Sequence, residues 1–427
     1  MRITIFSMGS RGDVEPLLAL ASRFLAVGHH PVVVSSPDHA ELAAHYGVDF
    51  APFGPPLSSL MSEEVIELVE SGDMIKLMRV TAAQRKEAVR AAIPETWRLG
   101  RDSDAVIFKG PAALFGYSIA EKLRVPCAEV QFFPVTPTHA FPPFLLGDGQ
   151  RRSGLGDRMR WWAAERITWQ FMQRATTNAQ RRTVLDMPRI SLSGVRRQQE
   201  REGMPLFYAY SPHVLPRPSD WPGRIHVTGY YPTSAPPEWS PPDGLRAFVE
   251  AGDPPVSFGL GSVPVAGKAR LVEAFLTALE RTGRRGILVS GWTGLGRDVD
   301  LPDHVHRVES VPYEWLFPRV AAAVHHGGAG TTAAGLRAGV PTVVTPVSGD
   351  QPSWGRRVAE LGAGPDPIPI KQVDADRLTT AIETATTDGA MSDRARELGA
   401  LLRAEDGVGR TVELFEQHVR RWRPPAR

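Results

Sequence analysis

Cysteine is nearly absent from this chain of 427 residues. Its single thiol, Cys127, excludes an internal disulfide framework and any zinc or iron–sulfur site that needs several cysteines. It is compatible with a reducing compartment, and we expect a cytoplasmic protein. Long hydrophobic runs are missing too, since no stretch reaches the roughly 18 apolar residues of a membrane-spanning helix. The first apolar run, at residues 2–6, is too short for the hydrophobic region of a signal peptide.

An excess of charge of one sign is also lacking. The 49 basic residues nearly balance the 47 acidic ones, and the formal net charge is +2. Such a balance gives no electrostatic footprint for nucleic acid, so we expect no nucleic-acid partner, and at most a weak contact with a membrane surface. At about 150 residues per domain, the length suggests two or three domains.

Apolar runs of strand length alternate with helical patterns in the first half of the chain. The expected strands are residues 3–6, 31–35, 105–108 and 126–132, and the expected helices are residues 16–28 and 112–123. This alternation predicts a parallel sheet that is covered by helices on both faces.

Proline is dense between residues 211 and 244, which is typical of a semi-rigid linker and disfavours a helix or a central strand. The strand–helix alternation then resumes. The predicted fold is therefore α/β, with two Rossmann-like domains that face each other across a cleft. The expected parts are an N-terminal domain at 1–215, a linker at 216–243, a C-terminal domain at 244–405, and a C-terminal helix and tail at 406–427 that packs back on the N-terminal domain.

The most informative motif is the run His-His-Gly-Gly-Ala-Gly-Thr-Thr at residues 325–332. It follows an apolar strand and opens a helix. Glycines at such a place let the backbone approach a phosphate, and the helix N-terminus supplies unpaired N–H donors and the positive end of its dipole. His326 can bind a diphosphate by a hydrogen bond, or by charge when protonated. We therefore expect a nucleotide diphosphate over residues 326–331.

A carboxylate and an amide, Asp350 and Gln351, come at the start of a later predicted helix. Together these groups are suited to binding two or three sugar hydroxyls. The alternative is that Asp350 only caps the helix.

These motifs resemble the donor signature of the inverting, two-domain family 1 glycosyltransferases. The opening loop at residues 9–16 is similar to that of the bacterial antibiotic and sterol glucosyltransferase branch, and residues 211–230 and 364–371 also resemble the sterol enzymes. The resemblance extends over nearly the whole chain. The matching donor motifs are residues 325–332, Gly339-Val340-Pro341, Asp350-Gln351-Pro352 and Trp354-Gly355.

The resemblance implies two domains of the GT-B type, with the acceptor bound by the first and the nucleotide sugar by the second. It assigns the diphosphate to His326, Gly328, Gly330 and Thr331, with a further contact from Ser262. It assigns the nucleotide base to the backbone of Val311, and the sugar to Asp350 and Gln351. The tryptophan on which plant members stack the base is replaced at about Ser310, so Trp292 is a candidate for stacking, with simple packing as the alternative.

The resemblance makes Asp13 the general base. The alternative is that Asp13 caps a helix that begins near Pro16. An aspartate is a weak base for an alcohol, so its surroundings, Arg11 among them, must set its basicity.

The acceptor is expected to be a lipophilic natural product or a sterol-like alcohol, held by Ser10, Phe133 and His139. The alternative interpretation is that His139 simply lies in a surface loop. The aromatic residues around Trp161, Trp162 and Trp169 predict an amphipathic helix, either packed in the core or lining the pocket.

The expected activity is metal-independent, inverting transfer of a hexose from a nucleotide diphosphate sugar, with UDP-glucose favoured and a TDP-sugar as the alternative. No cofactor is expected, and the three Asp-x-Asp pairs are interpreted as chance. The protein is expected to be a monomer or a homodimer. Alternatives are a non-catalytic helper protein, an epimerase, and an NAD-dependent oxidoreductase, because Gly328, Gly330 and Ala333 also fit a dinucleotide fingerprint.

Overall fold

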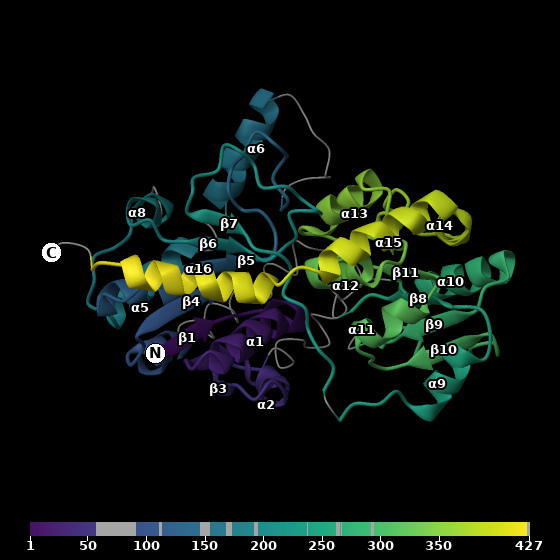
Figure 1. The fold of residues 1–427 in the computed structure, drawn as a ribbon, viewed down its shortest axis with the longest axis horizontal. Coiled ribbons are helices and arrows are strands. Elements are labelled where there is room, and N and C mark those ends of the chain that lie inside the picture. Colours follow the sequence, from purple (N-terminus) through teal and green to yellow (C-terminus); the bar gives the residue numbers. More distant parts are fainter. Residues whose placement is uncertain are drawn as a thin grey trace.

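The computed structural model of the protein describes residues 1–56, 91–110, 113–145, 154–167, 173–191, 195–236, 238–261, 265, 267–291 and 294–424. Within these residues, two parallel β-sheets form the frame of the molecule, one in each half of the chain (Figure 1). The first sheet has the strand order β3-β2-β1-β4-β5-β6-β7, and the second has the order β10-β9-β8-β11-β12. The predicted α/β fold with two Rossmann-like domains is confirmed.

The strands of the first sheet are β1 (Arg2–Phe6), β2 (His30–Ser35), β3 (Asp49–Pro52), β4 (Ala105–Lys109), β5 (Cys127–Gln131), β6 (Leu206–Tyr208) and β7 (Ile225–Val227). Those of the second sheet are β8 (Val256–Gly259), β9 (Gly286–Val289), β10 (Val305–Val308), β11 (Ala322–His325) and β12 (Thr342–Val344).

Helices cover both sheets (Figure 1). In the first half they are α1 (Arg11–Ala26), α2 (Ala40–His45), α5 (Ala113–Leu123), α6 (Gly154–Ile167), α7 (Arg174–Thr183) and α8 (Arg196–Arg201). In the second half they are α9 (Asp243–Glu250), α10 (Lys268–Thr282), α11 (Tyr313–Leu316), α12 (Ala329–Ala338), α13 (Gln351–Glu360), α14 (Ala375–Thr387), α15 (Gly389–Arg403) and α16 (Gly407–Arg421).

Strand β1 lies in the middle of the first sheet, paired in parallel with β2 and β4. Its side chains alternate between two buried faces. Ile3 and Ile5 belong to the core that contains Leu17 of α1, whereas Phe6 belongs to the core that contains Phe115 of α5. Because both faces are covered, the strand is apolar almost throughout, which is why the sequence predicted it correctly.

The predicted linker is shorter than expected, because part of it belongs to the first sheet. Strand β7 pairs with β6 in parallel register, so this domain extends through at least Val227 rather than ending at residue 215. An edge strand tolerates neighbouring prolines because it has a partner on one side only, and Pro222 and Pro232 flank β7 without interrupting it. Among the described residues between β7 and α9, the chain forms no further helix or strand.

The C-terminal helix α16 returns to the first domain and lies along α1 (Figure 1). Phe415 packs edge-to-face on Phe24 at 5.5 Å between ring centroids, and the Tyr231 and Thr411 hydroxyls are 2.6 Å apart. This helix therefore links the end of the second domain to the first domain.

The two domains also share an apolar junction. Trp354 of α13 is fully buried against Phe144 and Tyr210 of the first domain, with ring centroids 4.9 and 5.8 Å away. Of the predicted aromatic helix, Trp161 is buried, Trp162 is 62% exposed, and Trp169 lies outside the described residues. The helix is thus packed on one face only.

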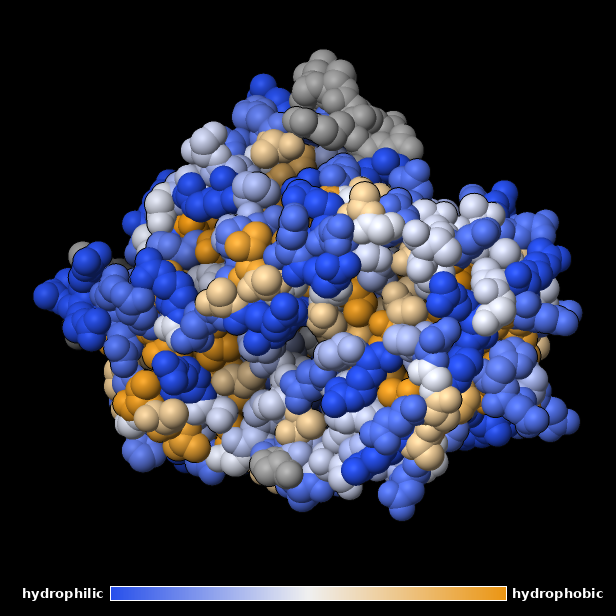
Figure 2. Space-filling model, turned by 45° about the vertical axis from the view of Figure 1, so that its right-hand side comes forward, coloured by the Kyte–Doolittle hydropathy of each residue, from blue (hydrophilic) through white to orange (hydrophobic). Residues whose placement is uncertain are grey.

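No described helix is long and apolar enough to cross a membrane. The face seen in Figure 2 is mostly hydrophilic, and its hydrophobic side chains lie in separate small groups.

Candidate active site

The carboxyl ends of β1, β4 and β5 meet at one edge of the first sheet, because these neighbouring strands are parallel. The loop after β1 leads into α1, which begins at Arg11, five residues earlier than the predicted start at Pro16. The lengthening has a local cause. Ser10 and Asp13 bind each other across the first turn, and this contact supports a helix start at Arg11 with Ser10 as the N-cap.

Asp13 is held from two sides. Its Oδ2 accepts hydrogen bonds from the backbone N–H of Ser10 at 2.9 Å and from the Ser10 hydroxyl at 3.2 Å. Its Oδ1 pairs with the Nζ of Lys109. The Asp13 side chain nonetheless stays 33% exposed. Asp13 therefore supports the helix start and also presents a carboxylate to solvent, and its role as the general base stays a prediction.

Gly9 makes this arrangement possible. Its φ of +135° lies in a region that L side chains rarely adopt, and a Cβ there would collide with the Asp13 carboxylate. A glycine is therefore required both by the backbone and by the space.

Lys109 is a site residue that the sequence reasoning missed. It is the last residue of the buried strand β4, its side chain is 5% exposed, and its Nζ lies 4.8 Å from the centroid of the Phe132 ring. The available signal was its position, since a charged residue that ends a buried strand points to the ligand-binding edge of a parallel sheet. Arg11, expected to act on Asp13, instead pairs with Glu15 through two hydrogen bonds of 2.8 Å.

The motif of the second domain forms the turn between β11 and α12. His325 Nδ1 accepts a hydrogen bond from the backbone N–H of Gly327 at 2.9 Å, which fixes the turn. Gly327 has a φ of +85°, and a Cβ there would lie 2.5 Å from Val344. His325 therefore has a structural role, because it holds the turn that leads to His326 and Gly328.

His326 is packed between two glycines. A Cβ on Gly261 would lie 3.1 Å from its ring, and a Cβ on Gly328 only 2.5 Å from its Nε2. Burial lowers the pKa of His326 to about 4, so at neutral pH the ring is uncharged. This removes the expectation that His326 acts by positive charge. Its buried Nδ1 has no hydrogen-bond partner among the described residues, which leaves a polar atom for a ligand.

The N-terminus of α12 carries no side-chain cap, because its N-cap residue is Gly328. The backbone N–H groups of the first turn, at Ala329, Gly330 and Thr331, therefore have no intrahelical acceptor. Gly330 is exposed, and a Cβ there would meet no atom within 4 Å. This helix end has the form of an anion site.

Asp350 stands at the N-cap position of α13 but makes no cap hydrogen bond. Its Oδ2 accepts instead from the Trp354 indole N–H at 2.8 Å. Burial, the largest effect, raises the pKa of Asp350 to about 6, and the Trp354 hydrogen bond and the Lys109 charge oppose this rise. The capping alternative is thus not supported.

Gln351 is buried beside Asp350. Its Oε1 accepts hydrogen bonds from the backbone N–H groups of Val347 and Ser348 at 2.8 and 3.2 Å. These contacts fix the side-chain amide and leave its nitrogen as the group able to donate.

The two halves of the site face each other. The pKa of Asp350 in the second domain responds to the charges of both Lys109 and Asp13 in the first. Ala329, in the first turn of α12, also packs against the cores of the first domain and of the domain junction. The predicted base, the diphosphate motif and the predicted sugar-binding pair therefore lie near one another where the two domains meet.

The other predicted residues are distributed unevenly. Val311 is buried in the second domain, and Phe133 is partly buried in the apolar junction. His139 is exposed, and its backbone N–H donates to Asp220 at 2.9 Å, which agrees with the surface-loop reading. Ser262 and Trp292 lie outside the described residues.

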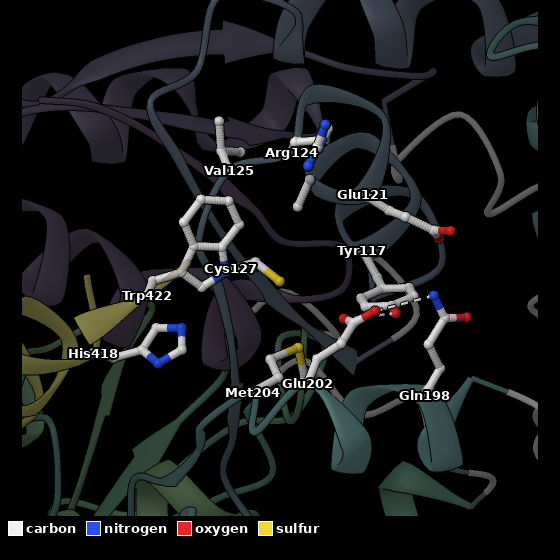
Figure 3. A pocket seen from close by; sticks show the side chains of 11 residues that line it. Tyr117, Glu121, Arg124, Val125, Cys127, Gln198, Glu202, Met204, His418 and Trp422 are labelled. Carbon is white, nitrogen blue, oxygen red and sulfur yellow. Dashed lines mark hydrogen bonds between the residues drawn. The ribbon is translucent and has the colours of Figure 1, made fainter. Parts of the chain in front are cut away.

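A separate cavity of about 440 Å³ lies at the opposite end of the first sheet (Figure 3). Cys127, at the start of β5, lines it together with Tyr117, Glu202 and Trp422. Since the proposed site lies beyond the other end of β5, this cavity is not part of it. Within the described residues, no group of three or more His, Cys, Asp or Glu side chains could hold a metal ion.

Comparison with known proteins gives the class of the fold. The structure superposes on CalG4, the calicheamicin glycosyltransferase, with a TM-score of 0.69 and 19% identity, over 99% of this chain and 100% of the other. The glycotransferase of kitacinnamycin gives a TM-score of 0.68 with 21% identity, over 98% and 99% of the two chains. The protein thus has the fold of the two-domain GT-B glycosyltransferases.

Sequence comparison then gives the family. The glycosyltransferase family 28 N-terminal domain matches residues 3–142, and the erythromycin biosynthesis protein CIII-like C-terminal domain matches residues 294–406. O-mycaminosyltylonolide 6-deoxyallosyltransferase of Streptomyces fradiae is 37% identical over 98% of this chain and 97% of its own. The chain belongs to the family 1 glycosyltransferases.

Sterol enzymes are among the relatives as well. Sterol 3-beta-glucosyltransferase UGT80A2 of Arabidopsis thaliana is 34% identical over 98% of this chain, and the sterol 3-beta-glucosyltransferase of Emericella nidulans is 32% identical over 97%. The chain spans only 66% of the plant protein and 30% of the fungal one.

Proposed function

We propose that the protein transfers a hexose from a nucleotide diphosphate sugar to a hydroxyl of a lipophilic acceptor, with inversion at the anomeric carbon and without a metal ion. The observation that carries the proposal is the proximity, where the two domains meet, of the Asp13 carboxylate to an uncapped helix N-terminus. Beside that N-terminus lies a buried His326 nitrogen that has no hydrogen-bond partner among the described residues. The first suits proton removal and the second suits a departing diphosphate.

In the proposed reaction, Asp13 takes the proton of the acceptor hydroxyl. The oxygen forms a bond to the anomeric carbon as the bond from that carbon to the diphosphate oxygen breaks, and the electron pair leaves with the diphosphate. Attack from the face opposite the leaving group inverts the configuration. Free N–H groups at residues 329–331 would stabilise the leaving charge, with a hydrogen bond from the neutral ring of His326.

The donor is proposed to be UDP-glucose, with a TDP-sugar as the alternative. Asp350 would accept from sugar hydroxyls, and the Gln351 amide nitrogen would donate to one. Their fixed orientation supports this assignment, because Trp354 and the amides of Val347 and Ser348 already hold both side chains.

The acceptor is proposed to be a sterol-like or polyketide alcohol. Relatives whose names specify sterols and a tylonolide support a bulky lipophilic substrate. So do the aromatic rings around the first domain's edge, where Phe132 lies beside Lys109 and Phe133 is only partly buried. Phe132 is the better placed of the two to meet an acceptor near Asp13.

A panel of UDP- and TDP-sugars against hydrophobic alcohols, with the mass of the acceptor as readout, tests the proposal. Transfer should occur in the presence of EDTA, and proton couplings at the new anomeric centre should show inversion. Absence of transfer from every donor, or retention of configuration, would contradict it. Purification with bound NAD would favour the oxidoreductase instead.

A further inference from the structure

Lys109 is a buried cation for which the proposed reaction has so far given no role. The chain has few lysines, and this one is 5% exposed at the end of a central strand. Its Nζ pairs with Asp13 Oδ1 and lies over the Phe132 ring. Removing an ammonium group from water is costly, and a buried ion pair contributes little net stability compared with apolar packing. Stability alone therefore does not account for a lysine at this place.

The contacts of Asp13 show what Lys109 does there. A carboxylate on a first-turn aspartate is free to rotate unless both oxygens are bound. Ser10 binds Oδ2 through its N–H and its hydroxyl, and Lys109 binds Oδ1 from the neighbouring strand. With either contact removed, the carboxylate plane loses one of its two fixed points. The remaining lone pairs of the carboxylate are those that a substrate hydroxyl could reach.

Lys109 also acts across the cleft. Its positive charge lowers the pKa of Asp350 in the other domain, and the negative charge of Asp13 raises it. The ammonium group thus lies within electrostatic reach of both the proposed base and the proposed sugar-binding carboxylate.

We propose that Lys109 is a positioning residue, which holds the Asp13 carboxylate in the orientation from which it removes the acceptor proton. This inference rests on the proposed glycosyl transfer. The proton moves from the acceptor to Asp13, and Lys109 keeps its three protons throughout. Its contribution is chiefly to kcat, because its direct contacts are with Asp13 and Phe132 of the first domain, and it reaches Asp350 of the donor-binding domain only through its charge.

The variants Lys109→Met, Asp13→Asn and the double variant test the role, with Lys122→Met on the exposed side of α5 as the control. Lys109→Met should lower kcat about 10- to 100-fold while the donor KM and the nucleotide Kd change less than about twofold. In the Asp13→Asn background the same change should cost almost nothing more, because there is no base left to position. Lys122→Met should leave all of these values unchanged.

Two outcomes would overturn the proposal: a wild-type kcat in Lys109→Met, or a loss of kcat that adds in full to that of Asp13→Asn. Should Lys109→Met fail to fold, Lys109→Gln, which keeps a hydrogen-bond donor, takes its place and should be intermediate. If wild type transfers no sugar, the proposed function fails by itself. The crystal structure of the variant then decides on Lys109, since an Asp13 carboxylate that keeps its wild-type orientation refutes the positioning role.

Discussion

The loop that leaves β1 and the loop that leaves β11 both pass through glycines into the N-terminus of a helix, and both face the cleft. At α1 the helix end is occupied from within, because Asp13 in the first turn binds Ser10 and pairs with Lys109. At α12 the N-cap is Gly328 and no acidic residue lies in the first turn. The adjacent His326 is uncharged, and its Nδ1 has no hydrogen-bond partner in the part of the chain that the structure describes.

This difference accounts for the different roles that we propose for two similar turns. A helix N-terminus that already holds a carboxylate has little left for an external anion, and what it offers is the carboxylate itself. A helix N-terminus without a cap offers its N–H groups to an anion. A neutral imidazole beside it can donate a further hydrogen bond to that anion without placing a positive charge next to the positive end of the helix dipole. In the proposed reaction, the first junction, between β1 and α1, takes a proton, and the second junction, between β11 and α12, takes the diphosphate.

Replacing Asp13 is expected to have the largest effect, since it removes the group to which we assign proton transfer. Asp13→Asn keeps the shape and the Ser10 contacts but is not basic. We expect kcat to fall at least about 100-fold, with nucleotide affinity unchanged in a calorimetric titration. Unchanged turnover would remove the functional distinction between the two junctions.

The glycines of the second junction allow a matched pair of changes with the next largest effect. A Cβ at residue 330 meets no protein atom within 4 Å, whereas one at residue 328 lies 2.5 Å from His326 Nε2. Gly330→Ala should therefore leave the melting temperature unchanged or slightly higher, yet weaken nucleotide binding roughly 10-fold or more by filling the space over the helix end. Gly328→Ala should lower both stability and affinity, because it displaces His326.

The contrast between the two variants carries the test. Full nucleotide affinity in Gly330→Ala would show that the diphosphate does not lie over this turn. A Gly328→Ala protein with unaltered stability would show that the ring of His326 has room to move.

How far the sequence predicted these junctions depends on the range of the contacts. The turn at residues 325–332 and the apolar strand before it are local features, and both were predicted correctly. Lys109 was missed because it is 96 residues from Asp13 in the chain, and only the pairing of β1 with β4 brings them together. The sequence left open whether His326 is neutral or charged, because burial, rather than any neighbour in sequence, lowers its pKa. Strand β7 was missed because prolines on both sides conceal a three-residue edge strand.

Replacing His326 is expected to have a smaller effect, and it tests whether the ring beside α12 acts in its neutral form. His326→Ala should weaken binding of a nucleoside diphosphate about 10-fold, the loss of one hydrogen bond to a charged group. Because the pKa of His326 is about 4, affinity for a nucleotide sugar should not follow an imidazole titration between pH 6 and 8. The measurement is made in the Asp350→Asn background, because Asp350, with a pKa of about 6, would otherwise titrate within this pH range. A drop in affinity near pH 6.5 in that background would mean that the ring binds as a cation.

The smallest expected effect concerns the contribution of Asp350, in the second domain, to the free energy of unfolding. Burial raises the pKa of Asp350 from 3.8 to about 6, so the folded protein holds this proton more tightly than the unfolded chain. Its contribution to stability is therefore present below about pH 4 and is lost as the pH rises through 6. Asp350→Asn, which keeps an oxygen for the Trp354 indole, should be more stable than wild type by roughly 1 kcal/mol at pH 7.5, and the difference should vanish near pH 3.5.

Urea unfolding at the two pH values measures this difference, and Asp366→Asn, at an exposed position of the same domain outside the cleft motifs, serves as the matched control. The gain in stability should accompany weaker binding of the nucleotide sugar but not of the free nucleotide, because the Asp350 carboxylate is proposed to bind the sugar alone. A variant that is less stable than wild type at pH 7.5 would show that the Asp350 carboxylate is satisfied by the fold itself, and its assignment to the sugar would lose its physical basis.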